Sequence, residues 1–203
     1  MSTSLLRQAF GITGACYHST EYSQGKVIFH AEMTDKKFQC PKCSNTHFIF
    51  RGIRTRLIHI PPIGTKKSFL NLITHRVQCK KCKYKYWPQL PFLKGRGRMT
   101  KSFVRYLKSL LQFATIKDVA NFAGVGWDTV KRIHKEFLQQ RYQNIPLEDV
   151  KYISIDEFSI RKRHKYMTVV TDIKTGQIIH AVEGRKKEDV ECFFKKLKKK
   201  QLL

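Results

Sequence analysis

Two motifs of identical spacing, CPKC at residues 40–43 and CKKC at residues 79–82, contain four of the six cysteines of this chain. Each CxxC pair brings two thiolates to one side of a tight turn, and two pairs supply the four ligands of a tetrahedral Zn²⁺ site. Between them lie the strand-like runs HFIF, RLIHI and FLNLITHRV, with PPIGTK as a turn. We predict a β-rich zinc ribbon over residues 35–89, with the structural zinc ligands Cys40, Cys43, Cys79 and Cys82.

Disulfides and redox-active CxxC sites are the alternatives to zinc. The N-terminal residues lack the basic start and long apolar middle of a secretion signal, which disfavours disulfides. A thioredoxin-type site requires a βαβ setting and a single pair. Three histidines lie on strand-like runs, where we expect surface or packing roles: His47, His59 and His75. The isolated Cys16 and Cys192 are interpreted as small apolar residues.

The charge of the chain is strongly one-sided. It has 40 Lys and Arg against 15 Asp and Glu, a net charge of +25, and 41% hydrophobic residues, enough to build cores. Such an excess indicates a polyanionic partner, either nucleic acid or an anionic membrane. No apolar run approaches the ~20 residues that span a bilayer. We therefore expect nucleic acid rather than a membrane, and a cytoplasmic, nucleoid-associated location.

Basic side chains are concentrated in the middle of the sequence. Around the second CxxC motif, Lys80, Lys81 and Lys83 alternate with aromatic residues, a pattern that suits contact with phosphates and stacking on bases. The alternative is a solvated rim over aromatic rings that pack the motif. A β-rich extension is expected over residues 1–34. Residues 90–100, LPFLKGRGRMT, predict a basic linker that follows the DNA backbone or minor groove through Arg96 and Arg98.

A helix-turn-helix DNA-binding domain is predicted over residues 101–145. An amphipathic helix at 101–114 precedes a second one capped by Thr115 and Asp118, and GVG at 124–126 forms the turn. The next helix, 127–141, has an apolar face and a polar, basic face. The candidate DNA-binding residues on it are Trp127, Asp128, Thr129, Lys131, Arg132 and Lys135. The alternative is a generic three-helix bundle whose basic face is only solvated.

From residue 150, apolar residues recur at every second position, the spacing of a β-strand. KYISID at 151–156 alternates apolar and polar residues, and strands follow at 166–172 and 176–184. An amphipathic helix covers 186–200. Three antiparallel strands and a helix predict the opening half of an RNase H-like domain over 150–203. The expected fold class is therefore α+β and multidomain.

The whole order resembles the N-terminal half of an ISL3-family transposase, an insertion-sequence enzyme. The resemblance covers CPKC and CKKC, DVANFAGVGWDTVKRIHK, and most specifically SIDEFSIRKRHKYMTVVTDIKTGQIIHAVEGR. It implies an RNase H-like domain that cuts and joins DNA strands with acidic residues holding Mg²⁺ or Mn²⁺. Asp156 matches the first catalytic acid of the family. Glu157 is expected on the opposite strand face, and Asp172 in a hairpin turn.

Family members are longer, and their remaining catalytic acids lie beyond the position matched by residue 203. We therefore expect a truncated or split transposase that binds terminal inverted repeats of double-stranded DNA. With only the first catalytic acid present, its metal site is incomplete, and we expect the chain alone to lack catalytic activity. A partial domain also exposes a sheet edge and an apolar face. The expected partners are a second copy or a full-length transposase. The alternatives are a repressor of transposition or transcription, and an RNA-binding or protein-assembly module.

Overall fold

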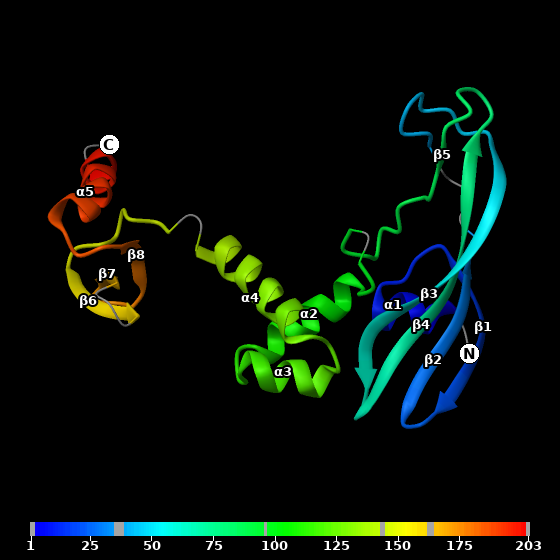
Figure 1. Cartoon of the computed structure of the whole chain (residues 1–203), viewed down its shortest axis with the longest axis horizontal. Coiled ribbons are helices and arrows are strands. Elements are labelled where there is room, and N and C mark those ends of the chain that lie inside the picture. Colours follow the sequence, from blue (N-terminus) through cyan, green and yellow to red (C-terminus); the bar gives the residue numbers. More distant parts are fainter. Residues whose placement is uncertain (1–2, 35–38, 96, 143–144, 162–164, 202–203) are drawn as a thin grey trace. The chain divides into compact units, whose positions relative to one another are not determined.

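The computed structural model describes residues 3–34, 39–95, 97–142, 145–161 and 165–201. The chain forms two compact units, Met1–Phe137 and Leu138–Leu203, and each has its own sheet and helices (Figure 1). Both units mix strands and helices, which confirms the predicted α+β class. Within the described residues, no helix combines the length and apolar character needed to cross a bilayer.

One sheet organises the first unit. The strands follow the order β1-β2-β4-β3, and β5 also pairs with β4. They are β1 (Ala15–Ser23), β2 (Lys26–Met33), β3 (Phe48–Ile63), β4 (Lys66–Cys79) and β5 (Lys85–Tyr86). Because β2 pairs in parallel with β4, residues from the expected N-terminal extension share a sheet with the ribbon strands. The helix α1 (Thr3–Phe10), which the sequence pattern did not predict, precedes β1.

The hairpin of β3 and β4 is longer than the sequence pattern predicted. The runs HFIF and RLIHI belong to one 16-residue strand, and Pro61 and Pro62 lie inside it rather than in the turn. The pairing with β4 is irregular between Ile60 and Ile63. Proline has no N–H for a ladder hydrogen bond, and β3 is an edge strand, where this loss is tolerated. The turn itself contains only Gly64 and Thr65.

Alternation along β4 builds the core of this unit. Leu70 and Leu72 are fully buried, and burying each leucine side chain stabilises the fold by roughly 1.5–3 kcal/mol. Phe10 of α1 packs against Phe29 of β2 with a centroid separation of 5.8 Å. The first part of the expected linker joins the same core through the buried residues Leu90, Phe92 and Leu93. Their apolar side chains fix this segment on the sheet, despite the glycines and arginines that follow.

Three helices form the predicted helix-turn-helix: α2 (Lys101–Leu110), α3 (Ile116–Ala123) and α4 (Trp127–Tyr142). Thr115 caps α3 as predicted, since its hydroxyl oxygen accepts from the Asp118 N–H at 3.2 Å and donates to the Asp118 carboxylate at 2.6 Å. The core includes Leu107, Val119 and Val130, one residue from each helix. The helix α2 ends four residues earlier than predicted, and turn residues follow it.

The α3–α4 turn depends on Gly124. This residue is left-handed at φ 67°, and the N–H groups of Gly124 and Val125 reach back to the last carbonyls of α3. The carbonyl of Gly126 then accepts from Thr129 at 3.0 Å and Val130 at 3.2 Å, which starts α4. Gly126 is therefore the N-terminal cap of α4.

The second unit contains the three antiparallel strands and the helix expected from the sequence. These are β6 (Ile153–Arg161), β7 (Lys165–Asp172), β8 (Ile178–Glu183) and α5 (Lys187–Gln201), with β6 and β8 at the sheet edges. Val170 and Phe193 are buried where α5 covers one sheet face. On the edge strand β6, Ile155 and Phe158 are each 47% exposed. Because they are three residues apart, these two apolar side chains leave opposite faces of the edge strand.

We predict that Gly124→Ala lowers the free energy of unfolding of the first unit by about 1–2 kcal/mol. A Cβ is strained at φ 67° and would also lie 2.6 Å from Lys67 Nζ. Gly124→Asn is the matched control, because asparagine tolerates the left-handed conformation and brings the same contact with Lys67. Urea unfolding should show a smaller loss for asparagine. Equal losses would mean that crowding by Lys67, and not backbone strain, sets the cost.

Candidate metal centre and nucleic-acid interface

Two backbone turns present the four cysteines. In the first, the N–H of Ser44 donates to the Cys40 carbonyl at 2.8 Å, and in the second that of Lys83 donates to the Cys79 carbonyl at 3.1 Å. Ser44 and Lys83 have positive φ values of 54° and 58°, the conformation that tightens each turn. The pairing of Phe48 with Cys79 at the ends of β3 and β4 brings the turns together.

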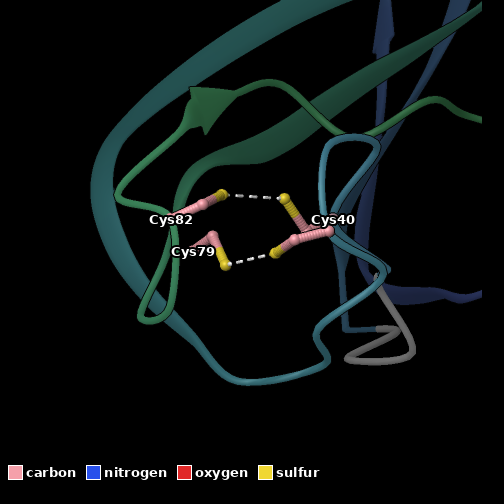
Figure 2. A group of neighbouring side chains, drawn as sticks. Cys40, Cys79 and Cys82 are labelled. Atoms are coloured by element: carbon pink, nitrogen blue, oxygen red, sulfur yellow. Dashed lines mark hydrogen bonds between the residues drawn. The ribbon is translucent and has the colours of Figure 1, made fainter.

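The four sulfur atoms converge at a spacing that suits zinc. Cys40 Sγ lies 3.4 Å from Cys82 Sγ, and Cys43 Sγ lies 3.6 Å from Cys79 Sγ. All four are within 4.8 Å of one another, and all are free thiols. Figure 2 shows the sulfurs of Cys40, Cys79 and Cys82 directed toward a common centre. Tetrahedral bonds of ~2.3 Å to Zn²⁺ place sulfurs about 3.8 Å apart, so the donor set fits.

The electrostatics of the cluster also favour a cation. Burial raises the pKa of the Cys79 thiol, but hydrogen bonds from the Cys82 backbone and the Asn45 amide outweigh this and lower it to about 6. The Tyr84 N–H lowers the pKa of the Cys82 thiol, but burial and the neighbouring sulfurs raise it to about 12. Four thiols this close cannot all ionise without a compensating charge, which a divalent ion would supply.

Asn45 is a supporting residue that the sequence did not single out. Its Nδ2 lies 3.5 Å from Cys79 Sγ and 3.1 Å from the His47 carbonyl, so one amide spans both turns. Hydrogen bonds of this kind orient metal ligands and tune their basicity. The only sequence signal is its position just after CPKCS, where an amide can reach back toward the sulfurs.

The histidines on strand-like runs have packing and pairing roles, as expected. His59 lies between Phe69 and Phe103, with ring centroids 4.8 and 5.4 Å away. Burial, helped by the charge of Lys67, lowers the pKa of His59. His75 Nε2 lies 2.8 Å from a Glu32 carboxylate oxygen. Among the described residues, the candidate metal cluster consists of the four cysteines alone.

The rim of the second cysteine turn consists of exposed lysines beside packed aromatic rings, and DNA contact by these lysines stays a prediction. Lys80, Lys81 and Lys83 are all exposed, so they are accessible to a polyanion. The rings of Tyr84 and Tyr86 stack on each other at 5.9 Å, and Tyr86 donates to the Gln39 carbonyl at 3.0 Å. These tyrosines therefore pack the turn and contact each other.

The predicted DNA-binding face of α4 is exposed. Its apolar face is buried through Val130 and Ile133. Lys131 Nζ lies 4.7 Å from the centroid of the Trp127 ring. The exposed candidates are Trp127, Asp128, Lys131, Arg132 and Lys135, whereas Thr129 is half-buried. Arg98 is exposed beside β3, and Arg96 lies outside the described residues.

Asp156 lies on β6 opposite Val169 of β7. Val170, the next residue, is in the core beneath α5, so Asp156 is on the other sheet face. Asp156 is exposed, and its Oδ1 accepts the Glu157 N–H at 2.8 Å. Glu157 pairs with Thr168 and therefore occupies the face of Val170, so the two acids are separated as predicted.

Asp172 is the last residue of β7, and its side chain closes the hairpin turn that follows, which is the role expected for it. Its carboxylate accepts from Thr175 Oγ1 at 2.5 Å and from the Lys174 N–H at 3.2 Å. The Thr175 hydroxyl, followed by other donors in the turn, lowers the pKa of Asp172. Its side chain is thus engaged in closing the β7–β8 connection.

Three family models match separate parts of the chain. Residues 36–82 match the zinc-finger of transposase IS204/IS1001/IS1096/IS1165, and residues 88–137 match the helix-turn-helix domain of transposase family ISL3. Residues 153–202 match the DDE domain of the ISL3 type, described as "Transposase". The chain belongs to the ISL3 family of transposases. In this ISL3-family chain, the zinc-finger match and the four close sulfurs together indicate a structural zinc site.

Curated relatives are insertion-sequence transposases. The transposase for insertion sequence element IS1001 of Bordetella parapertussis is 28% identical over 171 residues, covering 84% of this chain and 42% of that relative. The transposase for IS1557 of Mycobacterium tuberculosis is 25% identical over 161 residues, covering 77% and 35%. The chain therefore spans less than half the length of the relatives it matches. No solved structure matches it.

We predict that the native protein contains about one equivalent of zinc and that Cys79→Ser loses most of it. Replacing one thiolate leaves three sulfur ligands and removes the acceptor for Asn45. Metal analysis of undenatured protein, with thermal unfolding before and after chelation, measures both effects. Cys16→Ser is the matched control, because Cys16 is exposed and outside the cluster. A zinc content below about half an equivalent in the wild-type protein would contradict the four-thiolate site.

Proposed function

We propose that this chain acts in insertion-sequence transposition by binding double-stranded DNA at the terminal inverted repeats of its element. The observation that carries this proposal is the two-faced helix α4, which buries Val130 and Ile133 and exposes three basic residues, Lys131, Arg132 and Lys135. Family membership and the net charge of +25 support the same partner.

The helix-turn-helix geometry suggests how the contacts divide. In such domains the N-terminal residues of the second helix face base edges in the major groove, while other basic groups contact phosphates. Trp127 and Asp128 open α4 and would lie nearest the bases. Arg132 and Lys135 follow on the exposed face and carry the charge for guanine or phosphate contacts. The zinc site has a structural role in this proposal.

Asp156 is proposed as the first carboxylate ligand of a catalytic Mg²⁺ or Mn²⁺. Its exposed position on β6 leaves one carboxylate oxygen beyond the Glu157 hydrogen bond available to a hard cation. Two-metal phosphoryl transfer requires several carboxylates around the ions. In the part of the chain that the structure describes, no group of three or more potential metal ligands includes Asp156. We propose that these 203 residues bind the element ends without cutting them unaided.

The same observations favour a regulatory role as the second candidate. A chain that occupies the terminal repeats without cutting them would compete with active transposase for the same sites. It would also be able to pair with a second copy or with the full-length enzyme. The two candidates share the DNA-binding surface and differ only in the step after binding.

Arg132→Ala should weaken binding to a duplex carrying the terminal inverted repeat by roughly tenfold or more, because one charged contact to a base or phosphate is lost. Fluorescence anisotropy at a fixed, stated salt concentration measures this, with scrambled duplex and RNA of the same length as comparison. Arg7→Ala in α1 removes the same charge from an exposed position and should bind like the wild type. Equal affinity for RNA and duplex would contradict the proposal.

The purified chain should produce no strand-transfer product from a labelled terminal repeat with Mg²⁺ or Mn²⁺, because one carboxylate cannot hold the required ions. Gel analysis of reactions at a protein concentration that saturates the duplex tests this. Asp156→Asn should give the same background and the same DNA affinity. Products that appear with the wild type and vanish with Asp156→Asn would show that the chain assembles a complete site.

A further inference from the structure

An arginine cluster lies on the first unit, apart from α4 and from the lysines of the cysteine turn. Arg54 and Arg56 are two residues apart on β3, so their side chains leave the same face of the sheet. Arg98 lies beside them, because its carbonyl accepts the N–H of His59 at 2.8 Å along the edge of β3. Strand pairing thus places the three arginines in one region, where the charges of Arg54 and Arg98 both act on Arg56.

Two of the three arginines, Arg54 and Arg56, are each held by a specific contact. The Arg54 guanidinium carbon lies 4.1 Å from the centroid of the Trp87 ring. Stacking on an aromatic face restrains the guanidinium plane while leaving its N–H edge able to donate. Arg56 Nη2 donates to the Gly97 carbonyl at 2.6 Å, which holds its guanidinium against the segment that follows the apolar residues Phe92 and Leu93. The cluster is therefore pre-organised.

The local charge balance is unfavourable in the free protein. Burial, followed by the positive charges of Arg54 and Arg98, lowers the pKa of Arg56. The ion pairs found among the described residues involve neither Arg54 nor Arg98. Repulsion within the cluster would be relieved by an anion that accepts several N–H bonds. A phosphate group does this best, since its oxygens match the planar guanidinium fork.

We propose that Arg54, Arg56 and Arg98 form a second DNA-contact surface that binds phosphates of the same duplex as α4. This inference rests on the proposed function, because it requires α4 to engage DNA. This surface would contribute to affinity for the DNA backbone rather than to recognition of bases. The surface adds Arg54, Arg56 and the supporting Trp87 to the contacts expected from α4.

The connection between the cluster and the helices supports binding to one duplex. Thr100 donates its N–H to the His59 carbonyl at 3.0 Å, and its hydroxyl caps α2 by accepting from Phe103 at 3.1 Å. Lys94 also pairs with Glu136 of α4. The chain therefore passes from Arg98 into α2 through hydrogen-bonded backbone, which ties the arginine surface to the helix-turn-helix.

The salt dependence of binding tests the proposal. Each phosphate contact contributes about 0.9 to the slope of log K against log salt concentration. Arg54→Gln/Arg56→Gln should make the slope shallower by about 2 and weaken binding to the terminal-repeat duplex roughly tenfold near physiological salt. Arg54→Lys/Arg56→Lys should restore most of the slope, since the charges remain.

The matched control is Arg7→Gln/Lys26→Gln, which removes two charges from exposed positions outside the cluster and should leave the slope unchanged. Zinc content and thermal unfolding of each variant show that the fold is retained. Hydroxyl-radical footprinting should show protected backbone sugars beyond the α4 site in the wild type, and these alone should become accessible in the glutamine variant.

The outcomes separate this inference from the proposed function. If the wild-type chain does not bind the duplex, both are wrong. If it binds and Arg132→Ala weakens it, but Arg54→Gln/Arg56→Gln keeps the wild-type slope and footprint, only the second surface is wrong. A glutamine variant that alters self-association in ultracentrifugation while leaving the slope unchanged would assign the cluster to a protein contact and overturn the proposal.

Discussion

Backbone pairing on both edges of β4 is the constraint on which the first unit depends. The strand pairs in parallel with β2 and antiparallel with β3 and β5, and its residues Leu70 and Leu72 form the centre of the core. Its C-terminal end carries Cys79, and Lys67 near its start lies against the α3–α4 turn. A slip of β3 by one residue would move its buried face to solvent and also separate the two cysteine turns.

Local chemistry explains what could be predicted from the sequence. The CxxC spacing, the Thr115 cap and the alternation before Asp156 each depend on residues a few positions apart, and the fold class and site positions followed from them. The features that the sequence did not predict depend on non-local packing. The helix α1, the parallel pairing of β2 with β4 and the burial of Phe92 depend on partners far along the chain, for which a single sequence has no local signal.

The same distinction separates Asp156 from the arginine cluster. Strand alternation is enough to place Asp156 on the face opposite Glu157, whereas a metal site needs carboxylates that converge from several elements. The spacing of Arg54 and Arg56 in the sequence is enough to predict that they share a face of a strand. Their proximity to Arg98 depends on backbone pairing between β3 and residues that the sequence indicated as a linker. Glycine and arginine suggested a linker there, but three neighbouring apolar side chains pack the start of this segment into the core.

The cysteine site and the arginine cluster are physically connected through β5. Cys82 is followed by this short strand, which pairs Tyr86 with Val77 of β4 and so fixes the direction of the next residue, Trp87. Trp87 in turn restrains Arg54. A metal ion that holds Cys82 beside Cys40 would therefore position the two cysteine turns and also the beginning of β5. Zinc binding would thus stabilise the arginine surface through one aromatic ring, without itself contacting DNA.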